Sequence, residues 1–113
     1  MNVFLLSPAR QAEWCPSADI YQTHWGWILK FDLAGVRMED IQVVIASHSI
    51  TVSGVRRDYM LEEGCSYYSM EISYSRFERT IELPVELEGA TFRMDYRDGI
   101  LMVRISLREE QPR

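Results

Sequence analysis

Residues 77–84 read Phe-Glu-Arg-Thr-Ile-Glu-Leu-Pro, with an apolar side chain at every second position except one. Such alternation is typical of a half-buried β-strand, and Pro84 removes a backbone N–H where strand pairing has to stop. The exception, Arg79, falls in phase with the apolar residues, so the pattern turns its guanidinium toward the core. Burying that charge is costly unless a carboxylate or a bulge compensates. We therefore expect a strand here, with Arg79 in a buried or interfacial ion pair.

The same alternation recurs on both sides of this stretch. Downstream, Asp98-Gly99 supplies two positions that tolerate positive φ and predicts a tight hairpin. No window repeats apolar residues at i, i+3, i+4 and i+7, so long helices are not indicated. The sequence predicts an all-β fold, an immunoglobulin-like antiparallel β-sandwich of about seven to eight strands. The expected strands cover residues 18–21, 24–33, 41–45, 50–54, 67–74, 77–83, 92–96 and 101–107.

A segment of about a dozen residues, 55–66, interrupts the alternation. It is too long for a tight turn, yet it carries Tyr59, Met60 and Leu61. Apolar residues in a long loop usually pack against something. These three side chains could pack against the loop's own subunit or against a neighbouring subunit.

Length and charge limit the class of protein. The chain has 113 residues, which suits one domain, and 12 basic against 17 acidic residues give a net charge of −5. The basic residues alternate with acidic ones, which argues against a nucleic-acid partner, and no apolar run approaches the roughly 20 residues that cross a membrane. We expect a cytoplasmic protein. Its parts are a short N-terminal arm (1–14), one domain (15–107) and a short polar tail (108–113).

Residues that carry chemistry are sparse. Cys15 and Cys65 lie fifty positions apart, and His24 and His48 have no partners at ligand spacing. The sequence also lacks a phosphate-binding glycine loop and a nucleophile elbow. We therefore expect free thiols, no metal, no cofactor and no catalytic residue, and the protein is predicted not to be an enzyme.

Several short motifs occur in a characteristic order. Ala-Asp-Ile-Tyr at 18–21 is followed by Asp-Leu-Ala-Gly-Val at 32–36, then Phe-x-Arg-x-Ile-x-Leu-Pro at 77–84 and Asp-Gly-Ile-Leu at 98–101. This series resembles the α-crystallin domain of the small heat-shock proteins, over roughly residues 16–107. Two positions depart from the family pattern: Ala34 stands where a proline is usual, and Ser75 where a glycine is usual.

The resemblance implies an ATP-independent chaperone (a holdase) that binds unfolded or partly folded client proteins and suppresses their aggregation. The alternative is an interaction module of the same fold, acting as a co-chaperone or assembly adaptor. Holdase activity requires apolar surface and an accessible strand edge. By resemblance, the client or peptide groove would lie between two strands and contain Ile41, Val43, Ile45, Phe92 and Met94. The competing interpretation is that these residues are simply core.

The resemblance also implies a homodimer formed by loop exchange. The 55–66 loop would cross to a neighbouring subunit and bring its apolar residues beside that subunit's first strand. The predicted interface residues are Ile20, Tyr21, Tyr59, Met60, Leu61 and Arg79. Larger assemblies in the family use an Ile-x-Ile/Val motif after the last strand, and no Ile or Val follows Leu107 here.

Overall fold

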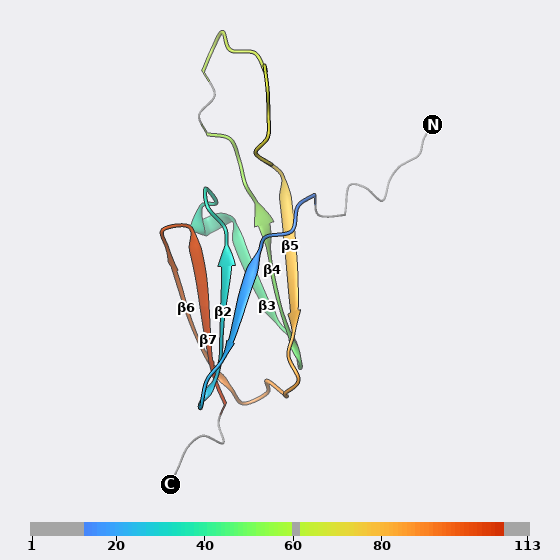
Figure 1. Cartoon of the computed structure of the whole chain (residues 1–113), viewed down its shortest axis with the longest axis vertical. Coiled ribbons are helices and arrows are strands. Elements are labelled where there is room, and N and C mark those ends of the chain that lie inside the picture. The colour runs from blue at the N-terminus through green and yellow to red at the C-terminus, as the bar shows by residue number, and fades with distance from the viewer. Residues whose placement is uncertain (1–12, 60–61, 108–113) are drawn as a thin grey trace, which may run out of the picture.

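Seven strands form two antiparallel sheets in the computed structural model, which describes residues 13–59 and 62–107 (Figure 1). One sheet has the order β1-β2-β7-β6 and the other β3-β4-β5, and a 3-10 turn, η3, precedes β3. The predicted all-β sandwich is confirmed. The elements are β1 (Ala18–Gln22), β2 (Gly26–Asp32), η3 (Met38–Asp40), β3 (Ile41–Ile45), β4 (Ser49–Val55), β5 (Arg76–Glu82), β6 (Thr91–Arg97) and β7 (Ile100–Ser106).

The core forms where the inner faces of the two sheets meet. Along β4, β5 and β7, buried residues alternate with more exposed ones, as the period-two pattern predicts. Burial of these apolar side chains is the main stabilising contribution to the fold. Among the described residues, the side chains that are 0% exposed include Leu29, Phe31, Ile50, Val52, Phe77, Val103 and Ile105.

The β6–β7 hairpin has the predicted turn. Asp98 and Gly99 adopt φ angles of 54° and 79°, as the two central residues of a tight hairpin require. A Cβ atom at position 99 would lie 2.9 Å from the Cα of Ala34, so the turn also needs a residue without a side chain there. This turn fixes the register of β6 against β7, with Arg97 opposite Ile100.

One predicted strand is wrong. Residues 67–74 form no strand, and the connection between β4 and β5 runs from 56 to 75 rather than from 55 to 66. Figure 1 shows it projecting beyond the end of the sandwich. Every residue from 66 to 74 is exposed, because the loop leaves the sheets before any strand of its own subunit can pair with it.

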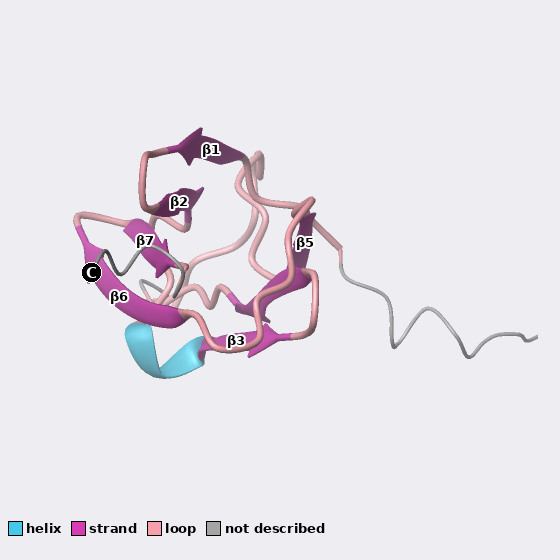
Figure 2. Cartoon of the chain, turned by 90° about the horizontal axis from the view of Figure 1, so that it is seen from below, coloured by secondary structure: helices cyan, strands magenta, loops and turns pink. Residues whose placement is uncertain are grey.

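The sandwich has two open sides, each bordered by one edge strand from each sheet. Figure 2 shows β3 and β6 at one side and β1 and β5 at the other. Each of these four strands pairs with only one strand of its sheet. Trp14 occupies part of the β5 edge through a parallel bridge to Phe77. The edges of β1, β3 and β6 present backbone groups that no other described strand pairs with, and such edges can accept another strand.

Candidate functional site

The predicted groove lies on the side bordered by β3 and β6. Ile45 is opposite Ile50, and Met94 is opposite Val103, and both partners are fully buried. Directly opposed residues lie on the same face of a sheet, so Ile45 and Met94 belong to the inner faces. They are nevertheless 39% and 45% exposed. An inner-face side chain stays accessible here because the edge strands leave this side of the sandwich open.

The other three predicted groove residues lie deeper. Ile41, Val43 and Phe92 are half-buried and pack against the core. The core interpretation thus fits these three residues, whereas a role of the five residues in client binding stays a prediction. These three residues are core, and Ile45 and Met94 extend the same apolar rows to the surface.

Tyr96 fixes β6 to the turn that precedes β3. Its hydroxyl lies 2.7 Å from the carbonyl oxygen of Leu33 and 2.6 Å from that of Val36, within reach to donate to either. Burial raises the pKa of the Tyr96 hydroxyl and outweighs the opposing effect of the Val36 carbonyl. The sequence places Tyr96 on the face of Phe92 and Met94, but it gives no sign of carbonyl partners sixty positions away.

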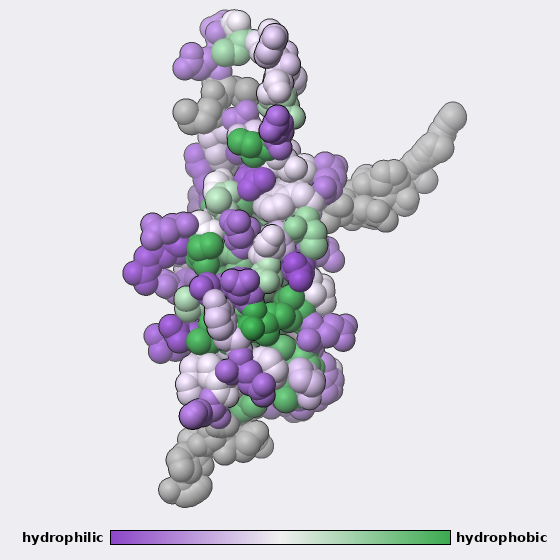
Figure 3. Space-filling view, viewed as in Figure 1, coloured by the Kyte–Doolittle hydropathy of each residue, from purple (hydrophilic) through white to green (hydrophobic). Residues whose placement is uncertain are grey.

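The opposite side of the sandwich carries the predicted dimer residues of β1. Ile20 and Tyr21 are 45% and 44% exposed, and β1 pairs only with β2. Figure 3 shows apolar surface between β1 and β5. This side therefore combines an unpaired strand edge with exposed apolar side chains.

Arg79 lies at this second side, in phase with the buried residues of β5, as predicted. The expected carboxylate partner is not found: among the described residues, no Asp or Glu forms an ion pair with Arg79. Its guanidinium instead donates to the carbonyl oxygen of Pro16 at 2.9 Å. Because Arg79 is only half-buried, one backbone carbonyl together with solvent compensates its charge. Its place in a dimer interface stays a prediction.

We expect Arg79→Ala to lower the free energy of unfolding by about 1–3 kcal/mol, because the carbonyl of the buried Pro16 loses its donor. Urea denaturation followed by tryptophan fluorescence measures the change. Glu78→Ala, on the same strand but facing outward, is the control. A variant at position 79 as stable as the parent would show that solvent replaces the hydrogen bond at no cost.

Tyr59, a predicted interface residue, contacts its own subunit. Its hydroxyl donates to Asp40 at 3.2 Å, and the guanidinium of Arg37 lies 3.6 Å from the centre of its ring. The first part of the loop is thus held against η3. This contact favours packing of Tyr59 against its own subunit rather than against a neighbour. Met60 and Leu61 lie outside the described residues.

The carboxylate of Asp40 is the centre of this cluster. Arg57 donates to its two oxygens at 3.2 and 3.4 Å, and this hydrogen bonding lowers the pKa of Asp40 below its usual range. A carboxyl whose pKa is lowered by folding stabilises the fold above its unfolded pKa, and this contribution is lost as the pH falls through the folded pKa. We therefore expect Asp40 to titrate at a more acidic pH than a free aspartate.

A carbon-13 NMR titration of the Asp40 carboxyl tests this prediction. Replacing Arg57 with Gln removes the charged donor, so the pKa of Asp40 should rise toward its usual range. If the parent and Arg57→Gln titrate at the same pH, the ion pair does not form in solution.

Arg56, the first residue of the loop, holds the last residues of the loop in place. Its side chain donates to the carbonyl oxygens of Ser73 at 2.8 Å and Ala34 at 2.9 Å, and its guanidinium lies 4.1 Å from the ring centre of Trp14. Trp14 in turn packs against Phe77, with ring centres 5.0 Å apart. One arginine thus connects both ends of the loop with the segment before β1. Sequence reasoning missed this contact, because its partners are far apart in the chain.

The chemistry-bearing residues are dispersed. Cys15 and Cys65 are exposed free thiols. Within 13–59 and 62–107, no group of three or more His, Cys, Asp or Glu side chains is placed to hold a metal ion. In the same residues, no helix is both long and apolar enough to cross a membrane.

A seven-stranded sandwich with a long β4–β5 loop and an open β3/β6 side defines a domain of the α-crystallin type. Among solved structures, heat shock protein 16.0 from Schizosaccharomyces pombe superposes with a TM-score of 0.76 at 27% identity, covering 89% of this chain and 94% of that one. The hspA protein from Xanthomonas axonopodis superposes with a TM-score of 0.70, also at 27% identity, covering 86% of this chain and 97% of that one.

Sequence comparison agrees. Residues 19–113 match the model of the Hsp20/alpha crystallin family, and the chain belongs to this family of small heat-shock proteins. Spore protein SP21 of Stigmatella aurantiaca is 33% identical over 99 residues, which are 87% of this chain and 59% of that protein. Small heat shock protein C2 of Rickettsia felis is 28% identical over 107 residues, or 95% of this chain and 70% of the relative.

Proposed function

We propose that this protein is an ATP-independent chaperone, a holdase that binds partly unfolded proteins and keeps them from aggregating. The observation that carries the proposal is the exposure of Ile45 and Met94, apolar side chains on the inner faces of two unpaired edge strands. Binding of an apolar segment there removes apolar surface from water, at about 25 cal/mol per Å². This step needs no nucleotide, metal or catalytic residue.

The backbone of the groove contributes as well. An extended segment can pair with the free edge of β3 or β6 while its alternate side chains contact Ile45 and Met94. Folded proteins seldom expose such segments, whereas partly unfolded proteins do. The site thus distinguishes clients by their state of folding rather than by sequence, and cytoplasmic proteins under stress are the proposed clients.

The proposed assembly unit is a homodimer formed by loop exchange. In the loop, Tyr68, Met70 and Ile72 alternate with more polar residues and are 101%, 52% and 59% exposed. This alternation is typical of a strand that lacks a partner. A second copy of the chain could supply that partner strand, because the edge of its β1 is unpaired and its Ile20 and Tyr21 are exposed. We therefore propose that residues 67–74 also supply apolar contacts to this interface.

Size-exclusion chromatography with one client in two states tests the holdase proposal against the adaptor alternative. α-Lactalbumin is suitable, because reduction and carboxymethylation keep it unfolded at room temperature. The holdase proposal expects co-elution with the unfolded form and none with the native form. If neither form co-elutes, the adaptor or co-chaperone alternative is favoured.

A further inference from the structure

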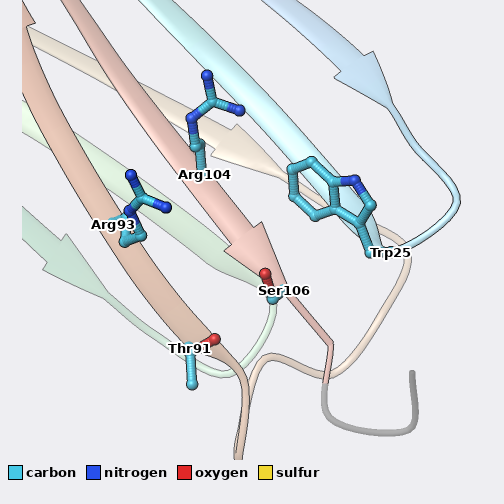
Figure 4. Close-up of a pocket in the computed structure, with 5 residues that line it drawn as sticks. All are labelled: Trp25, Thr91, Arg93, Arg104 and Ser106. Atoms are coloured by element: carbon cyan, nitrogen blue, oxygen red, sulfur yellow. The ribbon is translucent and has the colours of Figure 1, made fainter. Parts of the chain in front are cut away.

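A pocket of about 210 Å³ lies on the outer face of the four-stranded sheet, over β6 and β7. Figure 4 shows its lining: Arg93 on β6, Arg104 on β7, Trp25 just before β2, and the hydroxyls of Thr91 and Ser106. Pockets for drug-sized ligands usually measure about 300–1,000 Å³. This pocket therefore fits a compact group.

The polar lining residues form two cross-strand pairs. The register of β6 against β7 places Arg93 directly opposite Arg104, and Thr91 directly opposite Ser106. In Figure 4 the two guanidinium groups extend from neighbouring strands in the same direction. Like charges placed directly opposite each other destabilise a sheet. In a chain with a net charge of −5, this pair is a local concentration of positive charge.

The two arginines have no ion-pair partner among the described residues. On the outer face of β6 and β7 the acidic residue is Asp95, which is paired with Arg97 at 3.0 Å. A second hollow of about 310 Å³ continues from Arg93 and Arg104 toward these two residues. The guanidinium donors of the pocket are therefore available to an anion from outside.

Trp25 supplies an apolar wall. In Figure 4 the six-membered ring of its indole is turned toward Arg104, and the ring nitrogen is turned away from the arginines. An apolar wall can pack against the carbon portion of an organic anion, but it offers no donor to the charged group itself. Planar guanidinium groups, in turn, match the oxygens of phosphate with two parallel hydrogen bonds.

We propose that Arg93 and Arg104, with the hydroxyls of Thr91 and Ser106, bind the phosphate group of a small organic phosphate whose carbon portion packs against Trp25. The site is separate from the proposed client groove and does not depend on holdase activity. Binding of a dianion relieves the repulsion between the two arginines and stabilises the folded chain.

Calorimetric titration and thermal unfolding of the full chain with phenyl phosphate test the site, at an ionic strength held constant with sodium chloride. We expect saturable binding and a raised melting temperature. Arg93→Gln and Arg104→Gln should each weaken binding by at least about tenfold. Without ligand, both variants should melt no lower than the parent, because the like-charge repulsion is gone. Lys30→Gln, the control with the same change in charge on the outer face of the same sheet, should bind as the parent does, because Lys30 does not line the pocket.

Tighter binding of phenyl phosphate than of inorganic phosphate supports an organic phosphate as ligand, and equal affinity overturns the role of Trp25. The proposal is also overturned if sodium chloride alone reproduces the stabilisation. Undiminished binding by Arg93→Gln and Arg104→Gln would overturn it as well.

Discussion

Placing a negative charge in the groove should abolish protection of a heated client. Ile45→Glu and Met94→Glu each put a carboxylate beside the surface that receives apolar segments. Because desolvating that carboxylate opposes binding, affinity should fall by about tenfold or more. Both side chains are exposed enough to accept a charge without unfolding the sandwich. Light scattering of the client at a fixed ratio of chaperone to client measures the loss.

Val44→Glu is the matched control for this experiment. Val44 is 55% exposed and follows Val43 on β3, so its side chain points to the opposite face of the sheet. The same charge, one residue away, should leave protection intact. If all three variants protect the client equally well, clients bind elsewhere on the molecule.

If the proposed dimer forms through the loop, removing the apolar side chains of the loop should convert it into a monomer. Tyr68→Ser, Met70→Ser and Ile72→Ser, combined in one chain, keep the loop length and remove the surface that a partner would cover. Burying a large apolar side chain contributes about 1.5–3 kcal/mol, so the dimer should be weakened at least a hundredfold. Sedimentation equilibrium at micromolar concentration measures the change.

Tyr67→Ser is the control for the loop. Tyr67 is exposed, but it is out of phase with Tyr68, Met70 and Ile72, so in a strand it would point to the opposite face. It should weaken the dimer far less than the triple variant does. A triple variant that sediments as a dimer with unchanged affinity would place the interface outside 67–74.

Local patterns predict most of the fold. Alternation along 77–83 and 101–107 marks β5 and β7, and Asp98-Gly99 marks the hairpin, because each depends only on neighbouring residues. The error at 67–74 has a related cause. Alternation shows that a segment can form a strand, but pairing also needs a free strand edge within reach. Among the strands that the structure describes, none runs beside the projecting part of the loop (Figure 1).

The sequence predicts which sheet face carries the candidate groove residues, but not how exposed they are. Alternation puts Ile45 and Met94 on inner faces, whereas their exposure follows from the strand order, which the sequence does not encode locally. The partner of Arg79 is a carbonyl 63 positions away. The pairing of Arg93 with Arg104 could have been predicted from the sequence, because the two-residue turn at 98–99 fixes the register of the whole hairpin.

The measurement that most directly tests the proposed holdase activity is light scattering from an aggregation-prone enzyme heated without ATP, with and without the parent chain. The proposal predicts that scattering falls as the chain is added and is suppressed near one chaperone dimer per client chain. It also predicts that the client stays in soluble complexes with the chaperone. Scattering that is unchanged at a severalfold excess of folded chain would contradict the proposal.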